Sequence, residues 1–213
     1  ATARRNDLQD ETVLVTAGPT CEDIDPVRFL SNRSSGKMGY CLAAVAKSRG
    51  ARTILISGPS RLDPPPEVEF HPVRSAEEMR NAVLNHLPEA SIIIKAAAVA
   101  DFRPRFRTSE KIKKSNKDFI LELERTPDIL LEVSQHKGNR LLVGFAAETE
   151  NHVRNGIEKL KAKNLDLIVV NSASGPDSSF DSDMNHATLI DASGTAEEIP
   201  RVTTRAVADR ILD

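Results

Sequence analysis

The chain has 213 residues, a formal net charge of −2 and 4% aromatic residues, with no tryptophan. This length fits one large α/β domain with a substantial core, while the balanced charge and the few aromatics argue against a nucleic-acid-binding protein. No apolar run approaches the roughly 20 residues that span a bilayer. We therefore expect neither a membrane nor a nucleic acid as a partner.

The N-terminal stretch and the two cysteines give the expected organisation and compartment. Residues 1–11 are polar and charged and do not resemble a signal peptide. We expect them to form a tail or linker, and residues 12–213 to form the functional domain. Cys21 and Cys41 lack the spacing of metal ligands, which favours free thiols in a reducing compartment. The sequence therefore predicts a cytoplasmic protein.

Strand-like and helix-like segments alternate in the first half of the chain. A β-branched run at 12–18 predicts a buried strand, and the loop 19–37 that follows is long enough to indicate a functional role. Apolar residues then recur with helical spacing from Met38 until Gly50, a C-cap glycine. The same reasoning predicts strands at 52–60, 68–73 and 91–101, and a helix at 76–86 that Ser75 caps.

The middle of the chain interrupts this alternation. Residues 107–117 form a polar, lysine-rich loop, and apolar residues alternate through 118–124, which predicts a half-exposed antiparallel strand. Pro127 is expected to open a helix that Thr126 caps. The remaining segments predict a strand at 140–148, a helix at 150–164, a strand at 165–171, a polar loop at 172–186, a hairpin near 187–199 and a last helix from about 203.

This order predicts an α/β fold. It is a doubly wound, mostly parallel Rossmann-like sheet with helices on both faces and a small antiparallel excursion. Ligands of such sheets bind beyond the carboxyl ends of the strands. The residues that follow the strands are therefore the first candidates for a site: 18–20, 96–101, 144–149 and Asn171.

The stretch "SNRSSGKMG", residues 31–39, contains a Gly-Lys pair but is not a P-loop. Ser31 and Met38 occupy positions where the P-loop pattern needs glycine and Ser or Thr. Asn32 lies just before a predicted helix N-terminus, where its amide and the free backbone N–H groups suit an oxyanion. A simple cap by Asn32 or Ser35 explains the same pattern.

Lysines cluster in two places, one in a loop and one on a helix. Lys111, Lys113 and Lys114 lie in the polar loop, and Lys159 and Lys163 are four apart on one helix face. Lysine is a mobile point charge that suits phosphates, so the two clusters together suggest a polyphosphate ligand. Solvated surface charge is the alternative for both.

The end of the strand at 91–101 offers a second set of candidates. Asp101 suits Mg²⁺ on phosphates, or a turn cap. The small side chains of Ala96 and Ala97 would let a flat base approach the backbone, although alanines pack well anywhere. Phe145 suits contact with a ring or a place in the core. None of the five histidines shows metal-ligand spacing, and "TAGPT" is not the dinucleotide-binding glycine pattern.

Several motifs resemble those of one family, the bacterial phosphopantothenate–cysteine ligases, also called phosphopantothenoylcysteine synthetases. The resemblance covers nearly the whole chain after residue 11. It rests on "TAGPT…DPVRFLSNRSSGKMG", "AAAVADFRP", "KIKK", "TPDIL" and "GFAAET…KLKAKNLDLIVVN". It implies a step of coenzyme A biosynthesis in which CTP activates 4′-phosphopantothenate as an acyl-cytidylate and the amine of L-cysteine then displaces CMP.

The resemblance also implies roles for individual residues. Lys111, the first lysine of "KIKK", matches the lysine needed to form the cytidylate, and Asn32 matches the asparagine that serves the acyl intermediate. Asp101 would serve the triphosphate or its Mg²⁺. Lys95 departs from the small or apolar residue expected at its position. The nucleotide site would comprise Lys95, Ala96, Ala97, Asp101, Pro127, Asp128, Ile129, Leu130, Phe145, Lys159 and Lys163.

The family is dimeric and is usually fused to an upstream flavin-dependent decarboxylase. Residues 118–124 are the expected dimer element, because an exposed alternating strand is otherwise a liability. Two other functions remain open from the residues alone. A non-catalytic nucleotide- or phosphate-binding regulatory domain would use the same lysines, and a Rossmann oxidoreductase would share the fold without its glycine pattern.

Overall fold

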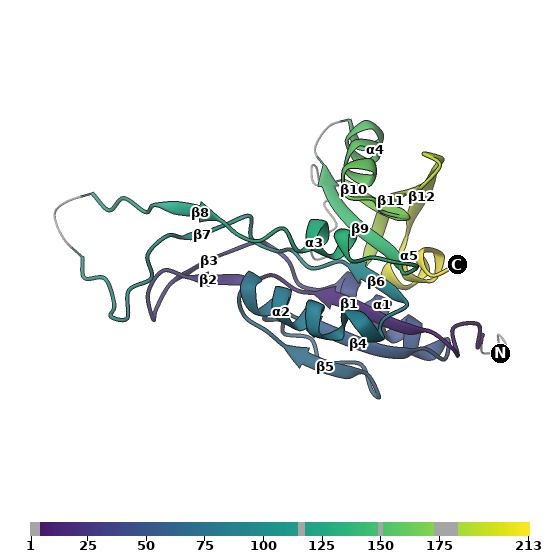
Figure 1. The fold of residues 1–213 in the computed structure, drawn as a ribbon, viewed down its shortest axis with the longest axis horizontal. Helices are drawn as coiled ribbons and strands as arrows, with labels where there is room; N and C mark the ends of the chain where they lie inside the picture. The colour runs from purple at the N-terminus through teal and green to yellow at the C-terminus, as the bar shows by residue number, and fades with distance from the viewer. Residues whose placement is uncertain (1–4, 115–117, 149–150, 173–182) are drawn as a thin grey trace.

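An eight-stranded sheet forms the centre of the protein (Figure 1). The computed structural model describes residues 5–114, 118–148, 151–172 and 183–213. Six strands are parallel, namely β5 (Glu69–Pro72), β4 (Arg52–Ser57), β1 (Thr12–Ala17), β6 (Ile92–Lys95), β9 (Leu141–Glu148) and β10 (Leu167–Ser172), in that order across the sheet. The antiparallel strands β11 (Met184–Asp191) and β12 (Ala196–Thr203) complete the far edge. The prediction of a doubly wound, mostly parallel sheet is confirmed.

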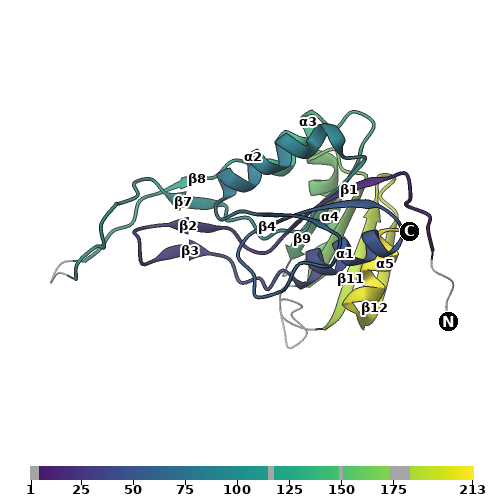
Figure 2. The same ribbon diagram turned by 90° about the horizontal axis from the view of Figure 1, so that it is seen from below.

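Helices cover both faces of the sheet, as the buried β-branched strands require (Figure 2). One apolar core lies between the sheet and the helices α1 (Lys37–Ser48) and α5 (Thr204–Ile211). The other lies beneath α2 (Ala76–His86), α3 (Ile129–Gln135) and α4 (His152–Ala162). The short 3₁₀ helix η1 (Leu87–Glu89) follows α2 directly.

The strand order reverses between β1 and β6. From β1 the chain moves outward to β4 and β5, whereas from β6 it moves the other way to β9 and β10. The connections after β1 and β6 therefore leave the sheet in opposite directions. In doubly wound folds this reversal opens a crevice at the carboxyl ends of the strands.

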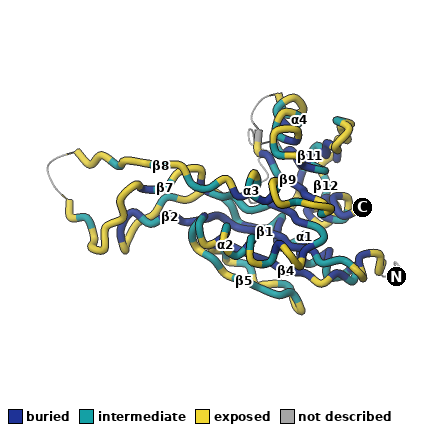
Figure 3. Tube along the Cα trace, viewed as in Figure 1, coloured by how far each residue is buried: buried dark blue, intermediate teal, exposed yellow. Residues whose placement is uncertain are grey.

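An arm projects from this body (Figures 1 and 2). It consists of the hairpin β2 (Cys21–Asp23) and β3 (Phe29–Ser31), and of the antiparallel pair β7 (Phe102–Pro104) and β8 (Leu123–Arg125) with the described residues between them. The burial-coloured trace shows the outer part of the arm as mostly exposed (Figure 3). The antiparallel excursion is thus present, but its strand covers 123–125 rather than the expected 118–124, because only these residues have a paired neighbour in β7.

The start and the cap of α3 differ from the prediction. Asp128 caps α3 by accepting the backbone N–H of Leu131 at 3.0 Å, so the helix begins after Pro127 and not at it. Thr126, the expected cap, instead donates its hydroxyl to the carbonyl of Ala100. Within the expected tail, Leu8 packs into the core at 9% exposure.

Gly39 sets the closest approach between α1 and the sheet. A Cβ atom at this position would lie 2.5 Å from the Cβ of Ala17 and 3.0 Å from the carbonyl oxygen of Thr16. Both neighbours belong to β1, which is buried in the middle of the sheet and has no room to move. Only glycine therefore lets the first turn of α1 lie against the end of β1.

Gly39→Ala should lower the free energy of unfolding by about 1–3 kcal/mol, because overpacking forces backbone shifts. Urea unfolding followed by circular dichroism measures the change. The double variant Ala17→Gly/Gly39→Ala should recover part of the loss, since it removes the nearest clashing atom. Equal stability of Gly39→Ala and the parent would show that α1 moves freely away from β1.

Candidate active site

Two adjoining pockets lie at the carboxyl ends of the strands, where the order reverses. The first, which we call the switch-point pocket, has a volume of about 560 Å³, and the second, the α3 pocket, about 520 Å³. They share one wall, formed by Ala97, Val99, Asp101, Phe145 and Lys159. Together they form one continuous cleft.

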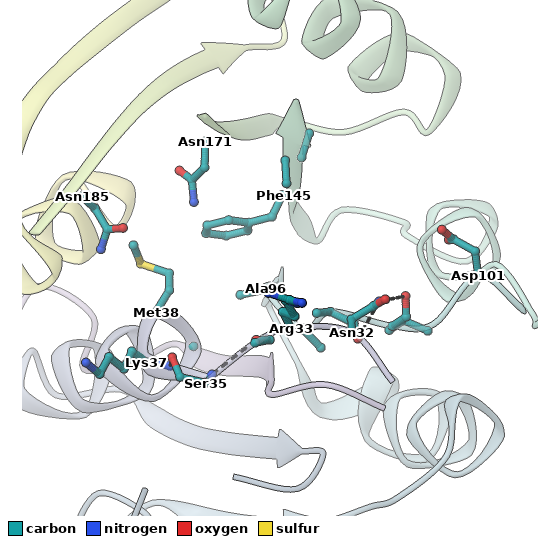
Figure 4. Close-up of a pocket in the computed structure, with 18 of the residues that line it drawn as sticks. Asn32, Arg33, Ser35, Lys37, Met38, Ala96, Asp101, Phe145, Asn171 and Asn185 are labelled. Carbon is teal, nitrogen blue, oxygen red and sulfur yellow. Dashed lines mark hydrogen bonds between the residues drawn. The ribbon is translucent and has the colours of Figure 1, made fainter. Parts of the chain in front are cut away.

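The switch-point pocket is built from segments that are far apart in the sequence (Figure 4). The loop before α1 and its first turn supply residues 32–39, and the connection after β6 supplies residues 96–99. The strands β9, β10 and β11 supply the remaining wall.

Gly36, the N-cap of α1, adopts a left-handed conformation with φ of 84° and has no side chain to cap the helix. The hydroxyls of Ser34 and Ser35 accept the N–H groups of Gly36 at 3.3 Å and of Lys37 at 3.4 Å. The first turn of α1 lines the pocket with the positive end of the helix, which favours an anion.

The charges of the switch-point pocket also favour an anion. Arg33, Lys37 and Lys159 line it, and Asp101 is its one acidic residue within the described parts of the chain. The ammonium group of Lys37 pairs with Asp183 at 3.1 Å. The excess of positive charge contrasts with the net charge of −2 of the whole chain.

Asn32 links the two sides of the strand reversal. Its Nδ2 donates to the carbonyl oxygens of Ala98 at 3.3 Å and Val99 at 3.0 Å. Two carbonyl acceptors require the NH₂ group on this side, so Oδ1 remains as the other polar atom of the side chain. In this conformation Asn32 holds the loop after β3 against the end of β6, and the expected donation to an oxyanion would require the amide to leave these carbonyls.

Two of the lysines that line the α3 pocket are bound by acceptor groups of the protein. Lys159 on α4 donates to the backbone carbonyl of Phe145 at 2.9 Å, and Lys163 pairs with the carboxylate of Asp128. Burial would raise the pKa of Asp128, but the hydrogen bonds from Lys163 and the N–H of Leu131 outweigh it and lower this pKa. Both lysine side chains are thereby fixed by acceptors of the protein itself.

Lys95 is the least ordinary residue of the cleft. It is the last residue of β6, is only 7% exposed, and its ammonium contacts the sulfur of Met79 at 4.0 Å. Burial lowers the pKa of Lys95 to about 7, and the charge of Asp128 only partly opposes this shift. A buried lysine is costly when charged. The site thus contains an amine that titrates near neutral pH.

Every predicted site residue except Lys111 lines one of the two pockets. Asn32 and Ala96 line the switch-point pocket, while Ala97, Asp101, Phe145 and Lys159 face both pockets. The predicted residues that line only the α3 pocket are Lys95, Pro127, Asp128, Ile129, Leu130 and Lys163. The geometry gathers these residues in one cleft, and their individual roles stay predictions.

Lys111 lies instead on the exposed arm. The backbone N–H of its neighbour, Ile112, donates to Asp25 at 3.1 Å. Asp25 is buried and also accepts the N–H groups of Val27 and Arg28, which lower its pKa although burial alone would raise it. This contact anchors the lysine-rich loop to the hairpin β2–β3, away from the cleft of its own chain.

Asn185 was missed by sequence reasoning. It lies on β11, which begins at residue 184 and not near 187 as expected, and its Nδ2 donates to Thr204 at 2.6 Å. Asn171 was noted only because it follows a strand. Its buried Oδ1 has no hydrogen-bond partner among the described residues, and both amides face the pocket from the side opposite Asp101 (Figure 4).

Asp101 is the residue of the shared wall that suits a divalent cation. No group of three metal ligands gathers in this cleft among the described residues. Mg²⁺ does not need one, because it commonly binds through one or two carboxylates together with the phosphates of a substrate and several waters. Asp101 fits Mg²⁺ that arrives with a polyphosphate.

The fold and the cleft define a class, the Rossmann-like α/β domains with a cationic cleft at the strand reversal. Within this class, the chain belongs to the family described as the DNA/pantothenate metabolism flavoprotein C-terminal domain, whose model matches residues 8–213. Among the described residues, no helix is both long and apolar enough to cross a membrane.

Relatives and solved structures agree with this assignment. The chain is 48% identical over 206 residues to the coenzyme A biosynthesis bifunctional protein CoaBC of Bacillus subtilis, covering 96% of this chain and 51% of that protein. It is 43% identical over 207 residues to a prokaryotic protein named cysteine/cysteine sulfinic acid decarboxylase, covering 96% and 58%. The chain thus spans little more than half the length of these relatives.

One solved structure matches almost throughout. The crystal structure of the C-terminal domain of a coenzyme A biosynthesis bifunctional protein CoaBC superimposes with a TM-score of 0.84 at 43% identity, covering 97% of this chain and 94% of that one. The chain thus matches the C-terminal domain of that CoaBC protein over nearly its whole length.

Lys95→Met should raise the free energy of unfolding at pH 6, by at most about 5 kcal/mol if the whole shift is relieved. The unfolded lysine keeps its proton up to its ordinary pKa near 10.5, whereas the folded lysine loses it near 7. Unfolding therefore takes up a proton between these values, and the parent gains stability as pH rises. The advantage of Lys95→Met should shrink correspondingly between pH 7 and 10.

Denaturant unfolding at pH 6 and pH 9.5 measures both effects. Lys137→Met is the matched control, because this half-buried ammonium is paired with Asp166 at 2.7 Å and its loss should destabilise the protein. A gain from Lys95→Met that does not change with pH would contradict the assigned titration.

Proposed function

We propose that this domain ligates 4′-phosphopantothenate to L-cysteine in coenzyme A biosynthesis, with CTP as the activating nucleotide. The observation that carries the proposal is the gathering, in one cationic cleft, of every residue expected to bind the nucleotide. The family assignment over residues 8–213 supports it, as does the name of the Bacillus subtilis relative.

The proposed reaction has two steps. The carboxylate of phosphopantothenate attacks the α-phosphorus of CTP, forming an acyl-cytidylate and releasing pyrophosphate. The amine of cysteine then attacks the acyl carbon, an amide bond forms, and CMP leaves with the electrons of the broken bond. A carboxylate is a poor electrophile until CMP is attached, so the protein has mainly to position the reactants and stabilise phosphate charge.

The two pockets suit the two anionic substrates. In the α3 pocket, Lys159 and Lys163 would exchange their present acceptors for phosphate oxygens, while Phe145 and the backbone of Ala97 would bound the base. Ala96 would contact the base from the adjoining switch-point pocket. In the switch-point pocket, the N-terminus of α1 would hold an anionic group of phosphopantothenate. The shared wall at Asp101 is where carboxylate and α-phosphate would meet, with Mg²⁺ on the phosphates.

A homodimer accounts for the arm and for Lys111. Apolar side chains along the arm are exposed, with Phe106 at 71% and Ile120 at 85%, and a second copy would cover them. Lys111 lies outside the cleft of its own chain, so we propose that it serves the cleft of the partner. The fused flavin-dependent decarboxylase expected from the sequence would precede residue 1 in a longer protein.

The nucleotide assignment is tested by mixing the purified domain with phosphopantothenate, cysteine, Mg²⁺ and each nucleoside triphosphate in turn. CTP should give pyrophosphate and the amide product, and chelation of Mg²⁺ should stop the reaction. A preference for ATP would be consistent with the ligation but would refute CTP as the activating nucleotide. Nucleotide binding without turnover would instead favour the regulatory-domain alternative. Because one relative is named cysteine/cysteine sulfinic acid decarboxylase, a reaction with cysteine as the sole substrate is a necessary control.

Asn32→Asp should let the acyl-cytidylate accumulate, because a carboxylate cannot donate to Ala98 and Val99 and adds negative charge beside the intermediate. Lys111→Gln should instead prevent the intermediate from forming. Mass spectrometry of quenched reactions distinguishes the two defects. Ordinary turnover by Asn32→Asp, with no trapped intermediate, would refute its role.

Mixing the two variants tests the dimer. If Lys111 serves the partner, mixed dimers have one site with both native residues, so refolded equimolar mixtures should recover about a quarter of the parent activity. Neither variant alone should do so. A mixture that stays inactive while sedimentation shows a dimer would place Lys111 in its own cleft.

A further inference from the structure

A second cluster of ligand-type side chains lies at the opposite end of the sheet. Glu69 and His71 are on β5, the edge strand, while His86 ends α2 and Glu89 ends η1. Arg52, at the start of β4, completes the cluster. None of these residues lines the cleft, so the proposed ligation makes no use of the cluster. Arg52 and Glu69 begin their strands, so the cluster lies toward the amino ends of β4 and β5, whereas the cleft is at the carboxyl ends of the parallel strands.

The geometry of the cluster is that of an open ligand set. The imidazole rings of His71 and His86 lie with centroids 4.3 Å apart. One ligand atom each from Glu69, His71 and His86 can be chosen so that all three atoms lie within 4.8 Å of one another. Glu69 Oε1 is 3.2 Å from His71 Nε2, and Glu89 Oε1 is 3.1 Å from His86 Nδ1.

Arg52 orients the two carboxylates. Its Nη2 donates to Glu69 Oε2 at 2.9 Å and its Nη1 to Glu89 Oε2 at 2.7 Å. These bonds leave both Oε1 atoms directed at the imidazoles. The two carboxylates and one guanidinium carry a net charge of −1, which a divalent cation would reverse to +1.

We propose that Glu69, His71 and His86 bind a zinc ion, with water as the fourth ligand. Imidazole nitrogen and carboxylate oxygen are ordinary zinc ligands at about 2.0–2.2 Å, which places tetrahedral ligands about 3.4 Å apart. Glu69 Oε1 and His71 Nε2 are already at 3.2 Å, and all three ligand atoms lie within 4.8 Å of one another. The side chains of His71 and His86 are 34% and 19% exposed, so an ion has access from solvent.

Such an ion would act on the fold and not on the reaction. It would connect the edge strand β5 to the end of α2 and to η1, three elements that otherwise meet here through hydrogen bonds and ring contact. β5 is short and has a neighbour on one side only, so it is a natural place for local opening. Zinc binding should therefore stabilise this edge of the sheet.

The competing explanation is a metal-free network in which each imidazole is satisfied by its carboxylate. His186 offers the matched control, because it makes the same kind of pair with Glu198, at 2.9 Å, on the distant strands β11 and β12. A lone histidine–carboxylate pair should not bind zinc appreciably. The comparison thus isolates the effect of bringing two such pairs together.

The test is calorimetric titration of the chelator-treated full chain with Zn²⁺ in a non-coordinating buffer, together with its melting temperature. One Zn²⁺ should bind per chain and raise the melting temperature. His71→Ala and His86→Ala should each weaken binding at least about tenfold, and His186→Ala should leave it unchanged. Circular dichroism confirms that the variants fold.

Two results would overturn the proposal. One is no Zn²⁺ binding by the parent chain, and the other is equal binding by the parent and the His71→Ala/His86→Ala double variant. Ligation activity is followed in parallel without added zinc, and it should be the same in the parent and in these variants. The zinc proposal and the proposed function therefore fail independently.

Discussion

The parallel pairing of β1 with β6 is the constraint on which the cleft depends. Their register continues past the sheet, where the N–H of Ala98 donates to Gly18 at 2.9 Å and the N–H of Thr20 donates to Ala98 at 3.2 Å. The two connections therefore run together before they separate. The first turn of α1 and residues 96–99, which follow β6, thus line the same pocket, and Gly39 keeps that turn close to β1. The switch-point pocket exists because of this sequence of contacts.

Electrostatics in the cleft is arranged before a ligand arrives. Lys159 and Lys163 are held by the carbonyl of Phe145 and by Asp128, so an incoming phosphate would replace existing acceptors and would not have to order free side chains. Lys95 behaves differently, because its burial favours the neutral amine near pH 7. Negative charge nearby favours the protonated form of a lysine. Binding of an anion near Lys95 and protonation of Lys95 are therefore coupled.

The two ends of the sheet carry different chemistry for a geometric reason. At the carboxyl ends, helix N-termini and diverging loops leave room and positive potential, which suits anions. At the amino ends the polar side chains satisfy one another at short range, as Arg52 does with Glu69 and Glu89. Such a packed set of imidazoles and carboxylates suits a cation. The same parallel topology thus separates an anion-binding end from a candidate cation-binding end.

Sequence periodicity by itself determined the element types and the doubly wound fold, because these depend on local patterns and on rules common to parallel sheets. Most residues of the cleft were predicted from the motifs shared with one family, and not from periodicity. Tertiary structure alone decided which distant segments meet. It brought Asn185 into the pocket from the antiparallel edge, buried Lys95 and left Lys111 on the arm. It also gave the cap of α3 to Asp128 rather than Thr126. Such outcomes depend on strand order, register and competing hydrogen-bond partners, none of which is encoded in the spacing of residues along one segment.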